Sequence, residues 1–377
     1  VGLLAAPLCA RADEGSDLSF KFESEVTGYK DSDATNVLTP GVRAEIEGVT
    51  DGWGVGAAFL VDVVTAASAD IVATASPKWT DVRYVPSLDG RFKVSDVTVS
   101  LGGGASIEND YIAGSGSVGL AIDLAEKTIT PSFSYGFGYD IAGRIGTPYS
   151  VYKLEVQRHA MTAAVSFVVN KSTIFVPSLS AVVELGDQEK PYRFLPTFLE
   201  SAEIAAGASR QDVDVARTSV RLAENSPDLR HRYAGAGLVA HRFDQATVRV
   251  EQRLYGDSWL LLASTTDFLL PVDASTSFRV WPHARFHAQK GVSFWRSDYR
   301  VTLDPTGNLL TAPQLRVGDR ELGPFIAATL GAGFRVGSDT FGLSVAADAI
   351  YTRFLDHLFI TDRIAGFGGV TIDAKVE

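Results

Sequence analysis

The stretch Ile129-Thr130-Pro131-Ser132-Phe133-Ser134-Tyr135-Gly136-Phe137-Gly138-Tyr139 decides the fold. Large apolar side chains or proline occupy every second position, and the residues between them are serine, threonine or glycine. Because successive side chains of a β-strand point to opposite faces, one face of this segment is bulky and apolar and the other is small and polar. A tilted strand of about 9 to 11 residues crosses the hydrocarbon of a bilayer. The segment therefore predicts a strand of a membrane barrel, with its apolar face toward lipid and its polar face toward the lumen.

The same alternation recurs along the chain. It is present in the segments 18–26, 53–63, 118–124, 161–169, 175–185, 326–336 and 341–351. Short connectors alternate with longer, more polar ones, as in outer-membrane barrels, where periplasmic turns are short and surface loops are long. The pattern predicts an all-β fold, a transmembrane antiparallel up-and-down β-barrel of about sixteen strands, with a range of about 14 to 18.

The positions of the connectors follow from the same pattern. We expect short ones near residues 50–52, 87–90, 125–127, 170–172, 244–245, 272–275 and 337–340, and longer ones at 30–36, 66–75, 105–111, 140–149, 186–230, 290–320 and 355–363. A tight turn at 255–258 is the exception on the surface side. The surface loop 186–230 is the longest, and its segment 199–205 is a candidate amphipathic helix. Two interpretations of this loop stay open: it folds into the barrel and narrows it, or it forms a surface flap.

Composition limits the function classes. No stretch of the 377 residues approaches the roughly 20 consecutive apolar residues of a membrane-spanning helix, which excludes a helical membrane protein. The formal net charge of −11 argues against nucleic acid as a partner, because a phosphate-binding protein needs a basic face.

The N-terminal residues have the pattern of an export signal. Residues 1–8 are apolar, like the end of a signal-peptide core, and Ala10-Arg11-Ala12 fits the small-x-small cleavage rule. We therefore interpret residues 1–12 as the remnant of a cleaved signal peptide and residues 13–377 as a single outer-membrane barrel. Cleavage after Ala12 removes Cys9, so we expect no disulfide or cysteine-metal site in the mature chain.

Two basic stripes are the candidate lining of the lumen. Arg249, Glu251 and Arg253 share one face of a predicted strand, and Arg279, His283, Arg285 and His287 share one face of another, opposite Phe278 and Val280. Basic stripes inside a barrel set up a field that selects for anions. The alternative is a ladder of arginine–carboxylate pairs between strands, with partners such as Asp267 or Glu251. Both interpretations stay open at this point.

Metal, cofactor and catalytic signals are weak. A zinc site at His283 and His287 needs a third ligand that the period does not supply, so we expect no metal site and no cofactor. Asp62 and Asp70 flank a Ser/Thr/Ala-rich loop and are weak candidates for calcium ligands, whereas a solvated loop is the simpler interpretation. A hydrolase would require His159 to act with a nearby hydroxyl, and no compact nucleophile motif is present.

Four segments occur in a set order: Asp62-Val63-Val64-Thr65-Ala66-Ala67-Ser68-Ala69-Asp70-Ile71-Val72, Ser106-Ile107-Glu108-Asn109-Asp110-Tyr111, Tyr255-Gly256-Asp257-Ser258-Trp259 and the run 279–289. In this order the chain resembles a bacterial family of predicted outer-membrane β-barrel proteins of unknown function. The resemblance implies an exported barrel, and it brings no known activity, substrate or catalytic residue.

These observations lead to three hypotheses of function. The first is a porin-like passive channel for small solutes in the outer membrane of a Gram-negative bacterium, with a field set by Arg249, Arg253, Arg279 and Arg285 and the long loop as its gate. The second is a non-conducting structural or interaction barrel that holds a periplasmic or surface protein partner. The third is an outer-membrane hydrolase. In each case outer-membrane lipid and lipopolysaccharide would surround the barrel.

Overall fold

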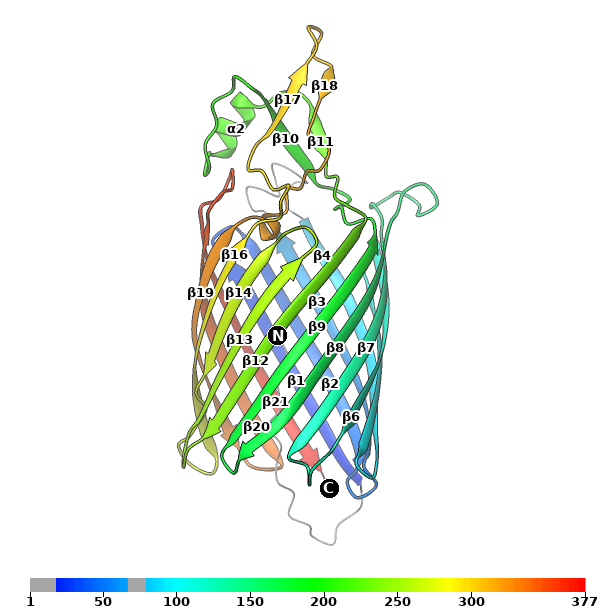
Figure 1. Ribbon diagram of the computed structural model, residues 1–377, viewed down its shortest axis with the longest axis vertical. Helices are drawn as coiled ribbons and strands as arrows, with labels where there is room; N and C mark the ends of the chain where they lie inside the picture. The colour runs from blue at the N-terminus through cyan, green and yellow to red at the C-terminus, as the bar shows by residue number, and fades with distance from the viewer. Residues whose placement is uncertain (1–17, 67–78, 377) are drawn as a thin grey trace.

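The computed structural model describes residues 18–66 and 79–376, and its main body is a closed antiparallel barrel (Figure 1). The sheet contains seventeen hydrogen-bonded segments. Of these, β14 (Leu262–Leu269) and β15 (Val272–Asp273) keep one register against β16 (Phe278–Lys290). They are one strand interrupted at Pro271, which has no N–H to donate, so the barrel has sixteen strands. The predicted fold class is confirmed.

The remaining strands follow one another in chain order. They are β1 (Leu18–Asp31), β2 (Thr35–Gly48), β3 (Trp53–Ala66), β4 (Trp79–Val94), β5 (Val97–Ile107), β6 (Tyr111–Ile122), β7 (Ile129–Ala142), β8 (Leu154–Asn170), β9 (Thr173–Gly186), β12 (Leu229–Arg242), β13 (Thr247–Asp257), β19 (Phe325–Gly337), β20 (Phe341–Phe354) and β21 (Asp362–Val376). The first strand pairs with the last, from Phe20 opposite Val376 to Asp31 opposite Ala365, and this pairing closes the barrel. No helix in the described part of the chain has the length and apolar character needed to span a bilayer.

The two faces of the wall differ as the period of two predicts. Phe133 lies opposite Leu120 on one neighbouring strand and Ala163 on the other. The exposed fraction is 50% for Phe133 and 70% for Leu330. Other large apolar side chains on the same face are also exposed, all around the barrel. These side chains cover the outside of the closed wall, where hydrocarbon would stabilise their exposure. The polar set therefore faces the interior.

Two predicted turns are misplaced. Residues 87–90 lie inside β4 and pair with both neighbouring strands, and the chain turns instead at Ser95-Asp96, where Ser95 has a φ of 53°. Ser-Leu-Asp-Gly has turn chemistry, but the register of β4 overrides it. Likewise Val272–Asp273 is strand, and the turn follows at 274–277. At the end of the barrel opposite the C-terminus, where long loops are expected, the connectors 32–34 and 108–110 are as short as the hairpin turns. The alternation of short and long connectors is therefore only partial.

The segments 187–228, 258–261, 291–324 and 355–361 stand at the end of the barrel opposite the C-terminus, and we call them the crown (Figure 1). The crown contains β10 (Phe194–Leu199), α2 (Arg210–Ala216), β11 (Arg221–Ala223), β17 (Tyr299–Leu303), β18 (Leu309–Thr311) and the 3-10 helix η1 (Arg320–Leu322). β10 pairs in parallel with β17, so loops far apart in sequence share one small sheet. The long loop spans 187–228, because Gly186, Leu229 and Arg230 belong to the wall.

The predicted helix at 199–205 is wrong. The helix of this loop is α2, which begins after Ser209. The Ser209 side chain accepts a hydrogen bond from the Asp212 backbone N–H, and the Asp212 side chain accepts one from the Ser209 backbone. This capping box satisfies two N–H groups that a helix start leaves free, and it fixes the start.

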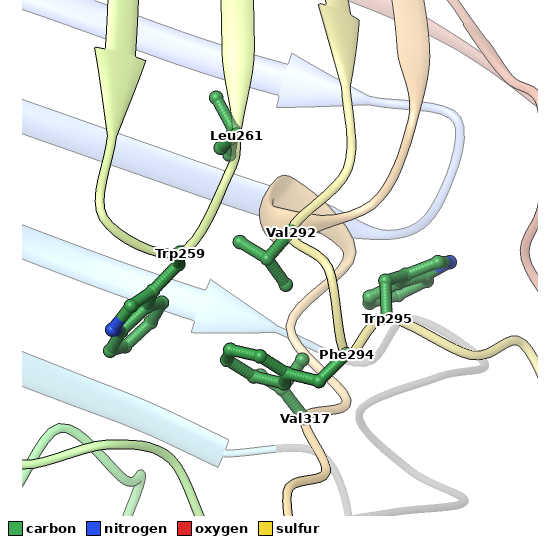
Figure 2. Close-up of a cluster of buried hydrophobic side chains, with 6 residues drawn as sticks. All are labelled: Trp259, Leu261, Val292, Phe294, Trp295 and Val317. Atoms are coloured by element: carbon green, nitrogen blue, oxygen red, sulfur yellow. The ribbon is translucent and has the colours of Figure 1, made fainter.

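Hydrophobic clusters hold the crown together and attach it to the rim. Figure 2 shows one of them, made of Trp259 and Leu261 from the β13–β14 turn and Val292, Phe294, Trp295 and Val317 from the β16–β19 loop. The ring centroids of Trp259 and Phe294 are 5.3 Å apart in an edge-to-face arrangement. A second cluster joins Phe198 of β10, Val213 of α2 and Leu358 of the segment 355–361. The crown is therefore a packed body and not a set of separate loops.

Candidate lumenal site

The structure brings the two predicted stripes together on three adjacent strands, β13, β14 and β16. Their register forms three rows: Arg253–Thr265–His287, Glu251–Asp267–Arg285 and Arg249–Leu269–His283. Val250 and Leu254 of β13 and Phe286 of β16 carry the exposed apolar face of the same strands. The rows therefore lie on the inner face, although β13 and β16 are not direct neighbours.

Most inner-face arginines of the barrel have a carboxylate partner. Arg43 donates to Asp89 at 2.6 Å and Arg83 donates through its Nε to Asp62 at 2.7 Å. Arg158 lies 3.1 Å from a carboxylate oxygen of Glu184. In these places the arginine–carboxylate ladder holds strands together, either direct neighbours or, for Arg43 and Asp89, β2 and β4 across β3. Within the predicted stripes, Arg279 fits the ladder too, because its Nε lies 2.5 Å from Asp273.

Three arginines of the stripes differ from this pattern. Within the described residues, the side chains of Arg249, Arg253 and Arg285 form no ion pair and no hydrogen bond, and those of Arg253 and Arg285 are exposed. Glu251, on the same face of β13, has no partner among the described residues either. We call Arg249, Arg253 and Arg285 the free arginine triad. A ladder therefore accounts for part of the stripes and not for the triad.

His283 contacts two inner-face carboxylates, one of them next to the triad. Its Nδ1 lies 2.8 Å from Asp348 of β20, and its Nε2 lies 3.2 Å from Asp267 of β14. This bridge spans β14, β16 and β20. Asp348 was not among the predicted site residues, although the alternation Ala347-Asp348-Ala349 already places it on the inner face. The period of two alone does not predict that Asp348 pairs with His283.

The wall across the lumen from Arg285 is small and neutral. β16 and β5 are eight strands apart in either direction around the ring of sixteen. The segments β5 and β6 contain no charged residue, and the inner face of β5 carries Thr98, Ser100, Gly102, Gly104 and Ser106. Strands on opposite sides of a closed ring face each other. No carboxylate of β5 or β6 therefore faces Arg285, whereas β13 with Arg249 and Arg253 lies opposite β3, where Asp62 is paired with Arg83.

Of the two weak metal candidates, Asp62 alone lies within the described residues. Asp62 accepts hydrogen bonds from Thr39 at 2.6 Å and from Arg83, so its oxygens are engaged in the ladder, while Asp70 lies outside the described residues. Another carboxylate group, which the sequence reasoning missed, consists of Asp81, Glu108 and Asp110, with oxygens within 4.8 Å of one another. Burial and the neighbouring charge of Asp81 raise the pKa of Glu108, which lies in the β5–β6 connector, to about 7. The three oxygens resemble a hard-cation ligand set, and nothing else among the described residues at this place points to an ion.

The arrangement that a hydrolase requires is absent at His159. This residue lies opposite Phe137 on the outer face, and its Nδ1 is 2.7 Å from the hydroxyl of Tyr135. Thr162 and Ser166 are offset from it by odd numbers of residues along β8, so they lie on the inner face. The two hydroxyls and the imidazole are therefore on opposite sides of the wall.

Comparisons with known proteins agree with this architecture. A family described as "Protein of unknown function (DUF3570)" matches residues 153–342, half of the chain. The bacterial polysaccharide outer membrane secretin matches with a TM-score of 0.50 and 7% identity, over 96% of this chain and 98% of that one. This likeness shows the fold alone. No curated protein matches the sequence.

Two further solved structures have lower scores. OccK5 (OpdH) of Pseudomonas aeruginosa matches with a TM-score of 0.43 and 8% identity, over 96% of this chain and 99% of that one. The siderophore receptor PirA of the same organism matches with a TM-score of 0.46 and 9% identity, over 95% of this chain. The chain spans only 62% of the length of that receptor.

Proposed function

Because the chain belongs to the DUF3570 family of proteins of unknown function, its role has to be argued from its own geometry, and we propose that it is a passive outer-membrane channel for small polar solutes. The observation that carries the proposal is the exposure of charged side chains inside a closed wall. The exposed fraction of the side chain is 51% for Arg91, 44% for Arg83 and 42% for Arg158. A lumen filled by protein would bury these groups, whereas barrels of about 16 to 18 strands leave an aqueous channel.

The crown supports a channel with a narrowed mouth. Its sheet and α2 lie beyond the rim and not within the barrel (Figure 1). The crown reaches inner-face residues at η1, among other places: Gln289 of β16 donates to the carbonyl oxygens of Glu321 in η1 and of Gly323 just after it, and Arg363 of β21 lies 3.2 Å from Glu321. The 3-10 helix thus connects strands on one side of the mouth. We infer that the loop 291–324, rather than the loop 187–228, sets the width of the entrance.

The location in the outer membrane is part of the proposal. The exposed apolar outer face supports it, because such a surface is stable against lipid and not against water. In cell fractionation we expect the protein with the outer membrane, surrounded by lipid and lipopolysaccharide, and we expect a heat-modifiable band in gels. Material that stays freely dissolved in the periplasm would contradict this location.

The second candidate is a barrel that does not conduct and holds a partner protein by its crown. Exposed apolar side chains on the crown favour it, since the exposed fraction is 82% for Val215 and 61% for Leu310. A planar bilayer experiment separates the two functions. The purified, folded chain is added to one side, with heat-unfolded protein as the control. Stable single-channel steps that only the folded protein produces are the expected result, and silence at every tested voltage would contradict the channel.

A further inference from the structure

We propose that the free arginine triad binds a small oxyanion, a carboxylate or phosphate group, inside the lumen. This inference rests on the proposed channel function and gives it a substrate class. The guanidinium group is planar, keeps its charge at all physiological pH values and presents paired N–H donors that match carboxylate and phosphate oxygens. The triad is the part of the inner face where described guanidinium groups have no protein oxygen to bind.

The register places the three arginines around one point of the wall. Arg249 and Arg253 are four residues apart on β13, and Arg285 belongs to the row between theirs, two strands away on β16. Neighbouring strands are about 4.8 Å apart and successive residues rise about 3.4 Å, so Arg285 and each of the other two start roughly 12 Å apart. Long, extended arginine side chains can close most of such a gap. One small anion can therefore contact two of them.

Two carboxylates stand inside this triangle and decide how tightly an anion is held. Asp267 is engaged by His283, whereas Glu251 has no partner among the described residues. Glu251 therefore opposes an incoming anion and reduces the net positive charge of the triad. Weak binding of this kind suits a channel, because a permeating solute must enter the site and also leave it. We infer a low-affinity site that the solute passes through.

The neutral wall of β5 and β6 strengthens the inference. An anion at Arg285 has hydroxyl groups and backbone across the lumen, and across from Arg249 and Arg253 the carboxylate of Asp62 on β3 is already paired with Arg83. Around β2 and β3, by contrast, guanidinium and carboxylate groups neutralise each other at short range, as in the pairs Arg43–Asp89 and Arg83–Asp62. The arginines without a carboxylate partner therefore determine where on the inner face an anion can bind.

The test is the saturation of channel conductance by sodium phosphate and by sodium succinate in planar bilayers. Arg285→Gln and Arg253→Gln should each raise the half-saturating concentration several-fold, because each removes a free donor fork. Arg253→Lys should raise it too, since it keeps the charge and loses the fork. Glu251→Gln should lower it. Comparing the two salts distinguishes a phosphate site from a carboxylate site.

The matched control is Arg335→Gln, which removes an inner-face charge that already pairs with Asp373 at 2.8 Å. It should leave the half-saturating concentration unchanged. The triad residues lack described partners, so their substitution should preserve folding, which the heat-modifiable band checks. A conductance that does not saturate in the unmodified protein, or an equal shift in Arg335→Gln, would overturn the site while leaving the channel in place. A silent, folded protein would overturn the channel function itself, and the site with it.

Discussion

Asp267 lies directly opposite Arg285 in the register of β14 and β16, yet its carboxylate contacts His283, at 3.2 Å, and forms no ion pair with Arg285. Opposite charges at facing positions of an antiparallel pair normally attract each other. The imidazole of His283 also reaches Asp348, at 2.8 Å, so one side chain occupies two carboxylates. The position of His283 thus determines that Arg285 stays free.

Removal of this imidazole should change the ion preference of the channel. In His283→Ala, Asp267 is released and can pair with Arg285, so we expect the preference for anions to fall. The measurement is the reversal potential across a bilayer with a potassium chloride gradient. His287→Ala, on the same face of β16, is the control and should leave the potential close to that of the unmodified protein. Equal potentials in the His283→Ala and unmodified proteins would contradict the account.

The crown segment 258–261, the turn between β13 and β14, depends on a buried ion pair. Asp257 accepts hydrogen bonds from Arg230 Nε at 2.9 Å and from the backbone N–H groups of Trp259 and Leu261, and its side chain is fully buried. Asp257→Asn leaves a buried guanidinium without its counter-charge, which costs about 3–5 kcal/mol. Amide hydrogen exchange at 258–261 should accelerate accordingly. The exposed pair Arg353–Asp362 offers a control, since Asp362→Asn should change exchange little. Amide exchange at 258–261 that is as slow in Asp257→Asn as in the unmodified protein would refute this role of Asp257.

Tyr299 holds two parts of the crown together. Its hydroxyl donates to the Val317 carbonyl at 2.8 Å and accepts from the Val317 N–H at 2.8 Å, and burial raises its pKa to about 12. Tyr299→Phe leaves that buried N–H and carbonyl without a partner, so we expect the crown to lose about 1–3 kcal/mol against local unfolding. Amide exchange of 299–303 and 317 measures the change. Tyr233→Phe, on the exposed outer face, should have no effect on the crown, and equal exchange in the two variants would argue against the role of Tyr299.

The tip of the β17–β18 hairpin should respond to acid. Hydrogen bonds from Thr306 and Asn308 lower the pKa of Asp304 from 3.8 to about 2. Because the folded state lowers this pKa, the ionised carboxylate stabilises the tip above pH 3.8, and the contribution is lost as the pH falls through about 2. Amide exchange at 304–308, corrected for intrinsic rates, should rise over this window. In Asp304→Asn the pH dependence should disappear, and a dependence that persists would point to another group.

The alternation of side chains was sufficient to predict the wall of the barrel. It placed Phe133 outside and Ser134 inside, and it put all seven candidate residues of the stripes on one face of their strands. Turn positions were less accurate where the chemistry of a short motif opposed the register, as at 87–90. Long-range pairing decides such cases, and a local motif carries no information about it.

The crown and the triad could not be predicted in the same way. The parallel pairing of Thr197 with Tyr299 joins loops about a hundred residues apart, and it exists because the rim brings those loops together. The free state of Arg285 depends on a contact between His283 and Asp348 that crosses two strand boundaries. A period of two gives the face of a residue, whereas its partner depends on register and on the competition between neighbours.

The central claim is that one face of each strand meets hydrocarbon and the other meets water. Neighbouring positions of β7 test it most directly, with Ser134→Cys on the inner face and Phe133→Cys on the outer face, each combined with Cys9→Ser. The folded variants are placed in lipid bilayers and treated with a charged thiol reagent that does not enter hydrocarbon. We predict rapid labelling of Ser134→Cys and little labelling of Phe133→Cys. Equal labelling at both positions, or labelling of the Phe133→Cys variant alone, would contradict the account.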